Sequence, residues 1–234
     1  MDHPTTSTHD WLTLLTGEAL LFGLLGKALY SNPEEEWLQL LVDEQVFIES
    51  PFASNWPEII EGLSRLTDWA NGWQGGEKAE SLVNLKTDYV RLFSGIGKSP
   101  VIPWESVYFS DNRLLFQEQT LDVRAWYRRF GLEAEKIHRE PDDHIGLELL
   151  FLSHLAALGI QALNEQNNAR FEELLNAQRE FLKQHLGAWA LTWCGLVEEN
   201  ARTDFYKGLA YLTRGALSAL SEVLDIKLAK DAAR

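Results

Sequence analysis

The sequence predicts an all-α protein of about ten helices, and three observations support this prediction. Apolar residues recur three or four positions apart along almost the whole chain, whereas alternating strand-like runs are scarce. Residues that end and start helices, such as Asn32-Pro33, separate the apolar segments. A hydrophobic fraction of 45% with nine tryptophans provides for a real core. With 234 residues, the chain can form one large helical domain or two small lobes around a shared core.

The first four helices follow from these signals in order. Asp10 can cap a first helix, and Asn32-Pro33 ends it and starts the second. The three glutamates after Pro33 suit the first turn of that second helix, because the helix dipole favours negative charge there. A glycine-rich loop at 71–76 follows the third helix. We expect these helices at about 10–31, 33–42, 56–69 and 82–93.

The helical pattern stops at residues 94–103, which are rich in glycine, serine and proline. This irregular segment leads to Trp104 and Tyr108, and a long loop between helices is a common place for binding groups. Helix resumes near Thr120 and runs to Phe130, where Gly131 suits the C-cap position.

Residues 131–139 form a charged connection, and we place a lobe boundary there. We expect an N-terminal lobe at about 1–130, a hinge at about 131–140 and a C-terminal lobe at about 141–234. Pro141 suits the first turn of a helix that runs to about Leu163, and the acids after Pro141 favour the same end. Three further helices are expected at about 169–184, 186–196 and 205–223.

The charge of the chain narrows the class of partner. A net charge of −14 argues against nucleic acid, because phosphate binding needs clustered Lys and Arg, and it favours a basic peptide or protein surface. Residues 28–64 contain no Lys or Arg but eight acids. Such a run is typical of a solvated face, and it can also attract a basic peptide from a distance. The acids are Glu34, Glu35, Glu36, Asp43, Glu44, Glu49, Glu58 and Glu61.

The single cysteine and the N-terminus indicate a cytoplasmic protein. Cys194 excludes an internal disulfide framework and lies in an apolar setting that favours buried packing. The first ten residues are acidic and polar, unlike a secretory signal. The apolar stretch from Trp11 to Tyr30 contains Glu18, Lys27 and three glycines, so we expect a poor membrane span.

The stretch Glu140-Pro141-Asp142-Asp143-His144 is the most informative, because it holds ionisable groups where the chain enters the core. His144 and Glu148 share a helix face, but a metal site needs more ligands and the pattern His-Glu-x-x-His is absent. Asp143 with His144 can do acid–base chemistry, yet no nucleophile stands in a recognisable setting. We therefore expect neither a metal site nor an enzyme. Two roles stay open for His144, which either caps or hydrogen-bonds a neighbouring loop or binds a partner directly.

The segment 95–99 (Gly-Ile-Gly-Lys-Ser) superficially resembles a phosphate-binding loop. The spacing Gly-x-x-x-x-Gly-Lys-Ser is not met, since Leu92 occupies the first glycine position, and a helix rather than a strand precedes the segment. A small-molecule or nucleotide-binding regulatory protein that uses the 94–103 loop, with Lys98 in it, is kept as the alternative function. Trp104 and Tyr108 serve either local packing or as binding anchors.

Three motifs occur in an order that resembles a known family. Together they look like the TorD/DmsD group of redox-enzyme maturation chaperones, which is related to the NarJ chaperones. His185-Leu186-x-x-Trp189 fits the later part of that pattern. The resemblance spans roughly Tyr89 to Trp189, and the helical layout extends it to the whole chain. The motifs are Tyr89-x-x-Leu92-Phe93, Pro103-Trp104-Glu105-Ser106-Val107-Tyr108 and Glu140-Pro141-Asp142-Asp143-His144.

The resemblance implies an all-helical, cytoplasmic chaperone that is not an enzyme. Its partner would be the twin-arginine leader and apo body of a molybdopterin oxidoreductase, held back from export until the cofactor is inserted. No cofactor of its own is implied, although weak GTP binding is proposed for some members, and the protein would be a monomer or a domain-swapped dimer. The implied leader-binding residues are Trp104, Ser106, Tyr108, Asp143 and His144, with Leu92, Phe93, Pro103, Glu140 and Pro141 shaping the site.

The chemistry of such a leader agrees with these residue types. A leader offers two arginines followed by an apolar helix-forming stretch, so its receptor needs carboxylates and an apolar groove. We expect His144 to tune release with pH. The expected carboxylates are Asp142, Asp143 and Glu105, and the expected apolar surface comprises Trp104, Tyr108, Leu92 and Phe93.

Overall fold

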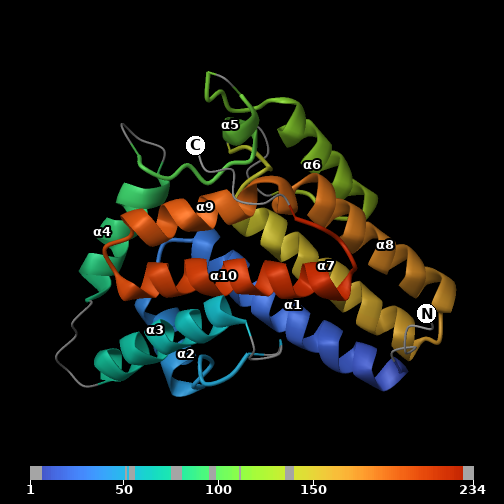
Figure 1. Ribbon diagram of the computed structural model, residues 1–234, viewed down its shortest axis with the longest axis horizontal. Coiled ribbons are helices and arrows are strands. Elements are labelled where there is room, and N and C mark those ends of the chain that lie inside the picture. The colour runs from blue at the N-terminus through green and yellow to red at the C-terminus, as the bar shows by residue number, and fades with distance from the viewer. Residues whose placement is uncertain are drawn as a thin grey trace.

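A computed structural model describes residues 7–50, 52, 56–74, 81–94, 99–110, 112–134 and 140–228. In these residues the chain forms ten helices, and its extended backbone pairs only at one isolated bridge between Trp104 and His144. The predicted all-α fold is therefore confirmed (Figure 1). The helices are α1 (Thr8–Tyr30), α2 (Glu35–Asp43), α3 (Pro57–Gln74), α4 (Leu82–Phe93), α5 (Ser106–Phe109), α6 (Glu118–Arg129), α7 (Ile145–Asn164), α8 (Asn168–Gln184), α9 (Leu186–Asn200) and α10 (Asp204–Val223).

The helices α1 and α7 form a long antiparallel pair through the middle of the molecule (Figure 1). Gly26 of α1 and Gly146 of α7 lie where the two backbones cross. A Cβ added to either glycine would stand 2.7 Å from the carbonyl oxygen of the other. Further along, Ser153 donates a hydrogen bond from Oγ to the backbone oxygen of Ala19 at 2.7 Å. Glycine at both crossing positions therefore permits this close approach.

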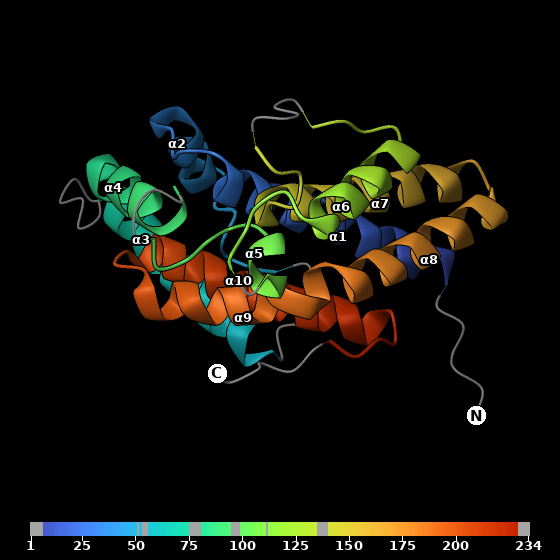
Figure 2. The ribbon, with the colours of Figure 1, turned by 90° about the horizontal axis from the view of Figure 1, so that it is seen from above.

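A second antiparallel pair, α3 and α10, packs beside the first, and α8 and α9 complete the bundle (Figures 1 and 2). The rings of Trp69 on α3 and Phe205 on α10 have centroids 4.6 Å apart. At the surface of this pair, Arg65 Nη1 lies 2.6 Å from Asp204 Oδ1. The helix α8 packs on α7, and α9 packs on both α8 and α10.

By length and composition alone, α1 and α7 are apolar enough to cross a membrane. In this fold the two helices pack against each other, and their most apolar windows are 44% and 56% buried. A helix at the centre of a large bundle has the same all-round apolar composition.

The expected lobe boundary at 131–140 does not divide the hydrophobic core. The helices α1 and α3 precede this segment, whereas their packing partners α7 and α10 follow it. One continuous core cluster therefore includes residues from both sides, such as Phe22 and Phe151. Residues 135–139 of the expected hinge lie outside the described residues, so the hinge stays a prediction.

The structure corrects two helix boundaries. Ser7, not Asp10, caps α1, because Ser7 Oγ accepts a hydrogen bond from Asp10 N and Asp10 Oδ2 accepts one from Ser7 N. The helix α3 continues past Trp69 to Gln74 and takes up the start of the expected 71–76 loop. Trp73 explains the extension, because its ring is buried and its Nε1 donates to Gln39 Oε1 at 3.0 Å.

Other expected features hold. Gly131 has a φ of +79° directly after α6, as its expected C-cap role requires. Cys194 is fully buried in α9. The short helix α5 was not expected, and it follows shortly after the irregular segment 94–103.

Candidate functional site

The two motif segments around Trp104 and His144 lie side by side as a short antiparallel pairing. Glu105 N donates to the backbone oxygen of Asp143 at 2.9 Å, and Ile145 N donates to that of Pro103 at 2.9 Å. We call residues 103–106 and 142–145 the paired segments. They are the only β-type contact in the described part of the chain. The pairing fixes the end of the irregular loop onto the start of α7.

The carboxylate of Asp143 holds the paired segments to two helices. Its Oδ2 accepts a hydrogen bond from Ser106 N, the first residue of α5, at 2.7 Å. Its Oδ1 accepts one from Thr120 Oγ1, in the first turn of α6, at 2.7 Å. The side chain is fully buried. Both oxygens are therefore used inside the protein, and in this conformation neither faces an arriving guanidinium group.

Asp142 is also engaged within the chain. Its Oδ2 lies 2.5 Å from Arg124 Nη2 and accepts a hydrogen bond from Arg124 Nε at 2.7 Å. Its backbone oxygen accepts one from the hydroxyl of Tyr127 at 3.1 Å. Only 1% of the Asp142 side chain is exposed. This buried ion pair ties the start of α7 to the middle of α6.

His144 is the N-cap residue of α7. Its Nδ1 accepts a hydrogen bond from Gly146 N at 3.0 Å, which assigns the ring proton of a neutral imidazole to Nε2. The ring lies edge-to-face against Trp104 and Tyr30, with centroids 5.7 and 5.1 Å apart. Of the two roles left open for His144, the capping role is the one that the structure shows. Because α7 begins at Ile145, Pro141 precedes the helix rather than lying in its first turn.

Two further glutamates line the interior beside the paired segments. Glu105 Oε2 lies 2.9 Å from His185 Nδ1, and burial raises the pKa of Glu105 despite this partner. Glu148, on the first turn of α7, is fully buried and accepts a long hydrogen bond from Trp189 Nε1 at 3.5 Å. Burial and the nearby carboxylates raise the pKa of Glu148 well above its ordinary value. These groups belong to the core rather than to a surface that a peptide can reach.

Some of the other predicted site residues are partly exposed, and the others are buried in the core. Glu140 accepts a hydrogen bond from the hydroxyl of Tyr30 at 3.2 Å. Trp104 and Tyr108 are partly exposed, and the hydroxyl of Tyr108 donates to the backbone oxygen of Ile102 at 2.9 Å. Several buried side-chain atoms in the described part of the chain have no hydrogen-bond partner, and Trp104 Nε1, Ser106 Oγ and Asp142 Oδ1 are among them. The remaining members, Pro103, Pro141, Leu92 and Phe93, are buried.

A row of rings connects Phe93 to Tyr108, since Tyr108 lies 5.0 Å from Trp189 and Phe93 lies 5.7 Å from Trp193 between centroids. Trp189 and Trp193 are themselves 6.5 Å apart on α9. The structure thus places Phe93 in the core and Tyr108 at its edge.

The sequence reasoning missed the residues that hold the paired segments in place. Thr120, Arg124 and Tyr30 had no assigned role, and His185 was noted only as part of the family pattern. Ordinary polar residues in amphipathic helices give no local signal of this kind. Their partners lie 18 to 110 positions away along the chain.

No group of three or more His, Cys, Asp or Glu residues in the described part of the chain is placed to hold a metal ion. Residues 95–98 of the glycine-rich segment lie outside the described residues. Ser99, which follows them, donates its hydroxyl to backbone carbonyls such as that of Val101 at 3.0 Å. The helix α4 precedes the segment, as the sequence predicted.

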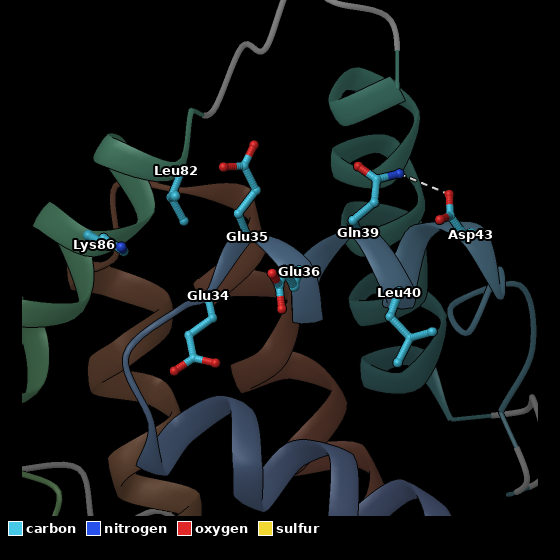
Figure 3. A pocket seen from close by; sticks show the side chains of 8 residues that line it. All are labelled: Glu34, Glu35, Glu36, Gln39, Leu40, Asp43, Leu82 and Lys86. Atoms are coloured by element: carbon cyan, nitrogen blue, oxygen red, sulfur yellow. Dashed lines mark hydrogen bonds between the residues drawn. The ribbon is translucent and has the colours of Figure 1, made fainter.

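Two surface hollows are lined by residues outside the paired segments. The acidic hollow, of about 900 Å³, is formed by α2 and α4 (Figure 3). The apolar groove, of about 490 Å³, is formed by α1, the 46–50 segment, α3 and α10. The acidic hollow is lined by Glu34, Glu35, Glu36, Gln39, Leu40, Asp43, Leu82 and Lys86. The apolar groove is lined by Leu20, Leu21, Leu24, Val46, Phe47, Glu49, Ser50, Leu63 and Leu212.

Comparison with known proteins agrees with the motif order. Residues 49–195 match the family described as nitrate reductase delta subunit. The chain is 29% identical over 206 residues to the Tat proofreading chaperone DmsD of Salmonella typhi, covering 88% of this chain and 90% of the relative. It is 30% identical over 167 residues to the chaperone protein TorD of Vibrio cholerae, covering 71% and 70% of the two chains. The TorD of Aliivibrio fischeri is 29% identical over 156 residues, covering 67% and 70%.

The family match covers both paired segments, and the relatives are similar along most of their own length. Their names are those of chaperones, which supports the expectation that this chain is not an enzyme. The chain therefore belongs to the nitrate reductase delta subunit family, among the TorD and DmsD chaperones of redox-enzyme maturation.

Proposed function

We propose that this protein is a cytoplasmic chaperone that binds the twin-arginine leader and the apo form of a molybdopterin oxidoreductase. It delays export of that enzyme until cofactor insertion and folding are complete. The observation that carries the proposal is the likeness to DmsD of Salmonella typhi, a Tat proofreading chaperone, along 88% of this chain. The net charge of −14 supports it as well, because an acidic protein attracts a leader with two arginines.

In this proposal the ten predicted site residues have three kinds of role. Trp104 and Tyr108 are partly exposed near the end of the loop and offer contact surface to the leader. Asp143 and His144 are positioning residues, because Asp143 accepts a hydrogen bond from Ser106 N at the end of that loop and His144 caps α7 beside it. The buried members, such as Phe93, give the surface its support.

The chaperone acts without a cofactor of its own in this proposal. The alternative function is a nucleotide-binding regulator. It differs from the chaperone in one testable property, which is GTP binding through Lys98. Titration of GTP into the full chain and into a Lys98→Ala variant tests it. Micromolar binding that depends on Lys98 would support the regulator.

Titration calorimetry with leader peptides tests the chaperone function. Each twin-arginine leader of the source organism's molybdoenzymes is titrated beside a variant in which both arginines are lysines. We expect micromolar or tighter binding of one leader and at least tenfold weaker binding of its Lys-Lys variant, since lysine cannot form the bidentate contacts of arginine. Absence of binding to every leader would overturn the proposal.

A further inference from the structure

The buried carboxylates of the paired segments leave open where the arginines of a leader would bind. Asp142 is paired with Arg124, Asp143 with Ser106 and Thr120, and all of these contacts are internal. Release of a buried carboxylate from its partners is costly. Guanidinium groups that arrive from solvent therefore require carboxylates that are already exposed.

Exposed carboxylates gather on α2. Glu34, Glu36 and Asp43 are exposed and line the acidic hollow, whose one basic residue among the described lining is Lys86 of α4. In Figure 3 the side chains of Glu34 and Leu40 point toward the side of α2 on which α1 runs, whereas Glu35 points the opposite way. The hollow thus combines negative charge with an apolar side chain, Leu40, that is 53% exposed.

The apolar groove lies beside α1. Leu20 and Leu24, one turn apart on α1, form one wall, and Val46 and Phe47 form another. Leu20 is 70% exposed although it is a large apolar residue. A volume of about 490 Å³ lies within the range of sites that take an organic ligand or the face of a helix. Glu49 gives the lining of this groove a single acid and no base.

The acidic hollow and the apolar groove are joined by one short piece of chain. After α2, Val46 N donates back to the oxygen of Leu41 at 3.2 Å, so the chain turns directly from one hollow into the wall of the other. Asp43 lines the first and Val46 lines the second. Three residues span at most about 11 Å between Cα atoms. At the other end of α2, Lys27 of α1 lies 5.0 Å from the ring centroid of Trp37, which fixes α2 against α1.

We propose that the apolar groove and the acidic hollow together form the docking surface for a twin-arginine leader. The apolar segment of the leader lies in the groove beside Leu20 and Leu24, and its arginine pair lies against Glu34 and Glu36. Charge complementarity selects this occupant, because residues 28–64 carry eight acids and no Lys or Arg. The leader combines a cationic pair with an apolar stretch, and residues 43–46 connect an acidic hollow to an apolar groove. This inference rests on the proposed function and adds a surface for the leader to the contacts that Trp104 and Tyr108 offer.

Calorimetry with two sets of variants tests the surface. Leu20→Gln removes an exposed apolar contact, and we expect about tenfold weaker leader binding. Its matched control is Leu121→Gln, a 61% exposed leucine on α6, which lies far from α2 in Figures 1 and 2. The double variant Glu34→Gln/Glu36→Gln should weaken binding about fivefold at low salt and less at high salt. Its control, Glu172→Gln/Glu222→Gln, makes the same change in net charge on α8 and α10.

A double-mutant cycle identifies the arginines as the partners of these acids. A leader with Gln-Gln in place of Arg-Arg should bind the wild-type protein and the Glu34→Gln/Glu36→Gln variant with equal affinity within about twofold. Equal loss of affinity for both leaders would refute the assignment of the arginine pair.

Two further outcomes would overturn the docking surface and leave the chaperone function intact. Wild-type protein would bind the leader, while Leu20→Gln and the acid variant would behave like their controls. Alternatively, Leu20→Gln would change the mass of the protein in sedimentation without changing leader affinity, which would assign the groove to a second copy of the chain. Failure of the wild-type protein to bind any leader would instead refute the proposed function itself.

Discussion

Replacement of Asp143 tests whether this residue positions the loop or binds the leader directly. In Asp143→Asn, the amide oxygen can still accept the hydrogen bond from Ser106 N. The amide nitrogen then faces Thr120 Oγ1, and a hydroxyl can turn to accept. Both hydrogen bonds survive, but the negative charge that strengthened them is lost. Asp143→Ala removes both and leaves two buried donors without partners.

The expected cost follows from these two hydrogen bonds. A hydrogen bond to a charged group contributes about 1.5–3 kcal/mol, and a neutral one contributes about 1 kcal/mol. Asp143→Asn should therefore lower the free energy of unfolding by about 1–2 kcal/mol. Asp143→Ala should lower it by about 3–5 kcal/mol. For a chain of this size, the alanine variant should melt about 10 °C lower.

Chemical denaturation followed by circular dichroism measures both costs, and calorimetry on the folded asparagine variant measures leader affinity. We expect a clear loss of stability and a change in leader affinity of less than about threefold. Thr120→Val is the matched control, because it removes only one partner of the same carboxylate and should cost about 1–3 kcal/mol. Unchanged stability of Asp143→Asn together with lost leader binding would refute the positioning role.

Two stability predictions follow from buried residues elsewhere in the fold. Burial raises the pKa of Glu18 from 4.5 to about 8, so the folded state holds the extra proton between these values and the free energy of unfolding falls as pH rises. The stability advantage of Glu18→Gln over wild type should therefore grow by about 2–3 kcal/mol from pH 5.5 to 7.5 in urea denaturation, and a constant difference would contradict the raised pKa. Gly146→Ala places a Cβ 2.7 Å from the oxygen of Gly26, and thermal denaturation should show a loss of about 1–3 kcal/mol or more. Gly72→Ala on α3, where a Cβ meets no atom within 4 Å, should instead gain about 0.5–1 kcal/mol, and equal effects would argue against the close crossing of α1 and α7.

Most of the helices could be predicted from the sequence because their apolar spacing and end signals are local. The sequence predicts an end of α3 at Trp69, which is too early. The last turn of α3 is held by the hydrogen bond of Trp73 to Gln39 on another helix, and this contact leaves no signal near the helix end. Pro141 was placed inside α7 because proline suits a first turn, but the cap of His144 starts that helix four residues later. Helix ends that depend on a distant partner are not encoded near the end itself.

The motif residues of the site could be found from the sequence, but their roles could not. Asp143 reads as an available carboxylate until the structure shows Ser106 and Thr120 on its two oxygens, 37 and 23 positions away. The apolar groove is formed by four separate segments, so no single stretch of the sequence predicts it. Leu20 in particular looks like any other residue of an apolar helix, and only its 70% exposure marks it.

Hydrogen exchange of the leader complex, read by mass spectrometry, tests whether the exposed hollows or the buried carboxylates of the paired segments receive the arginines of the leader. We expect the bound leader to slow exchange of backbone amides in residues 44–50 and at the start of α2. A leader with Gln-Gln in place of Arg-Arg, at a concentration that gives equal occupancy, should retain the effect at 44–50 and lose it at α2. Slowing confined to residues 103–108 and 142–146 would refute the docking surface, because the leader would then contact only the paired segments and their neighbours.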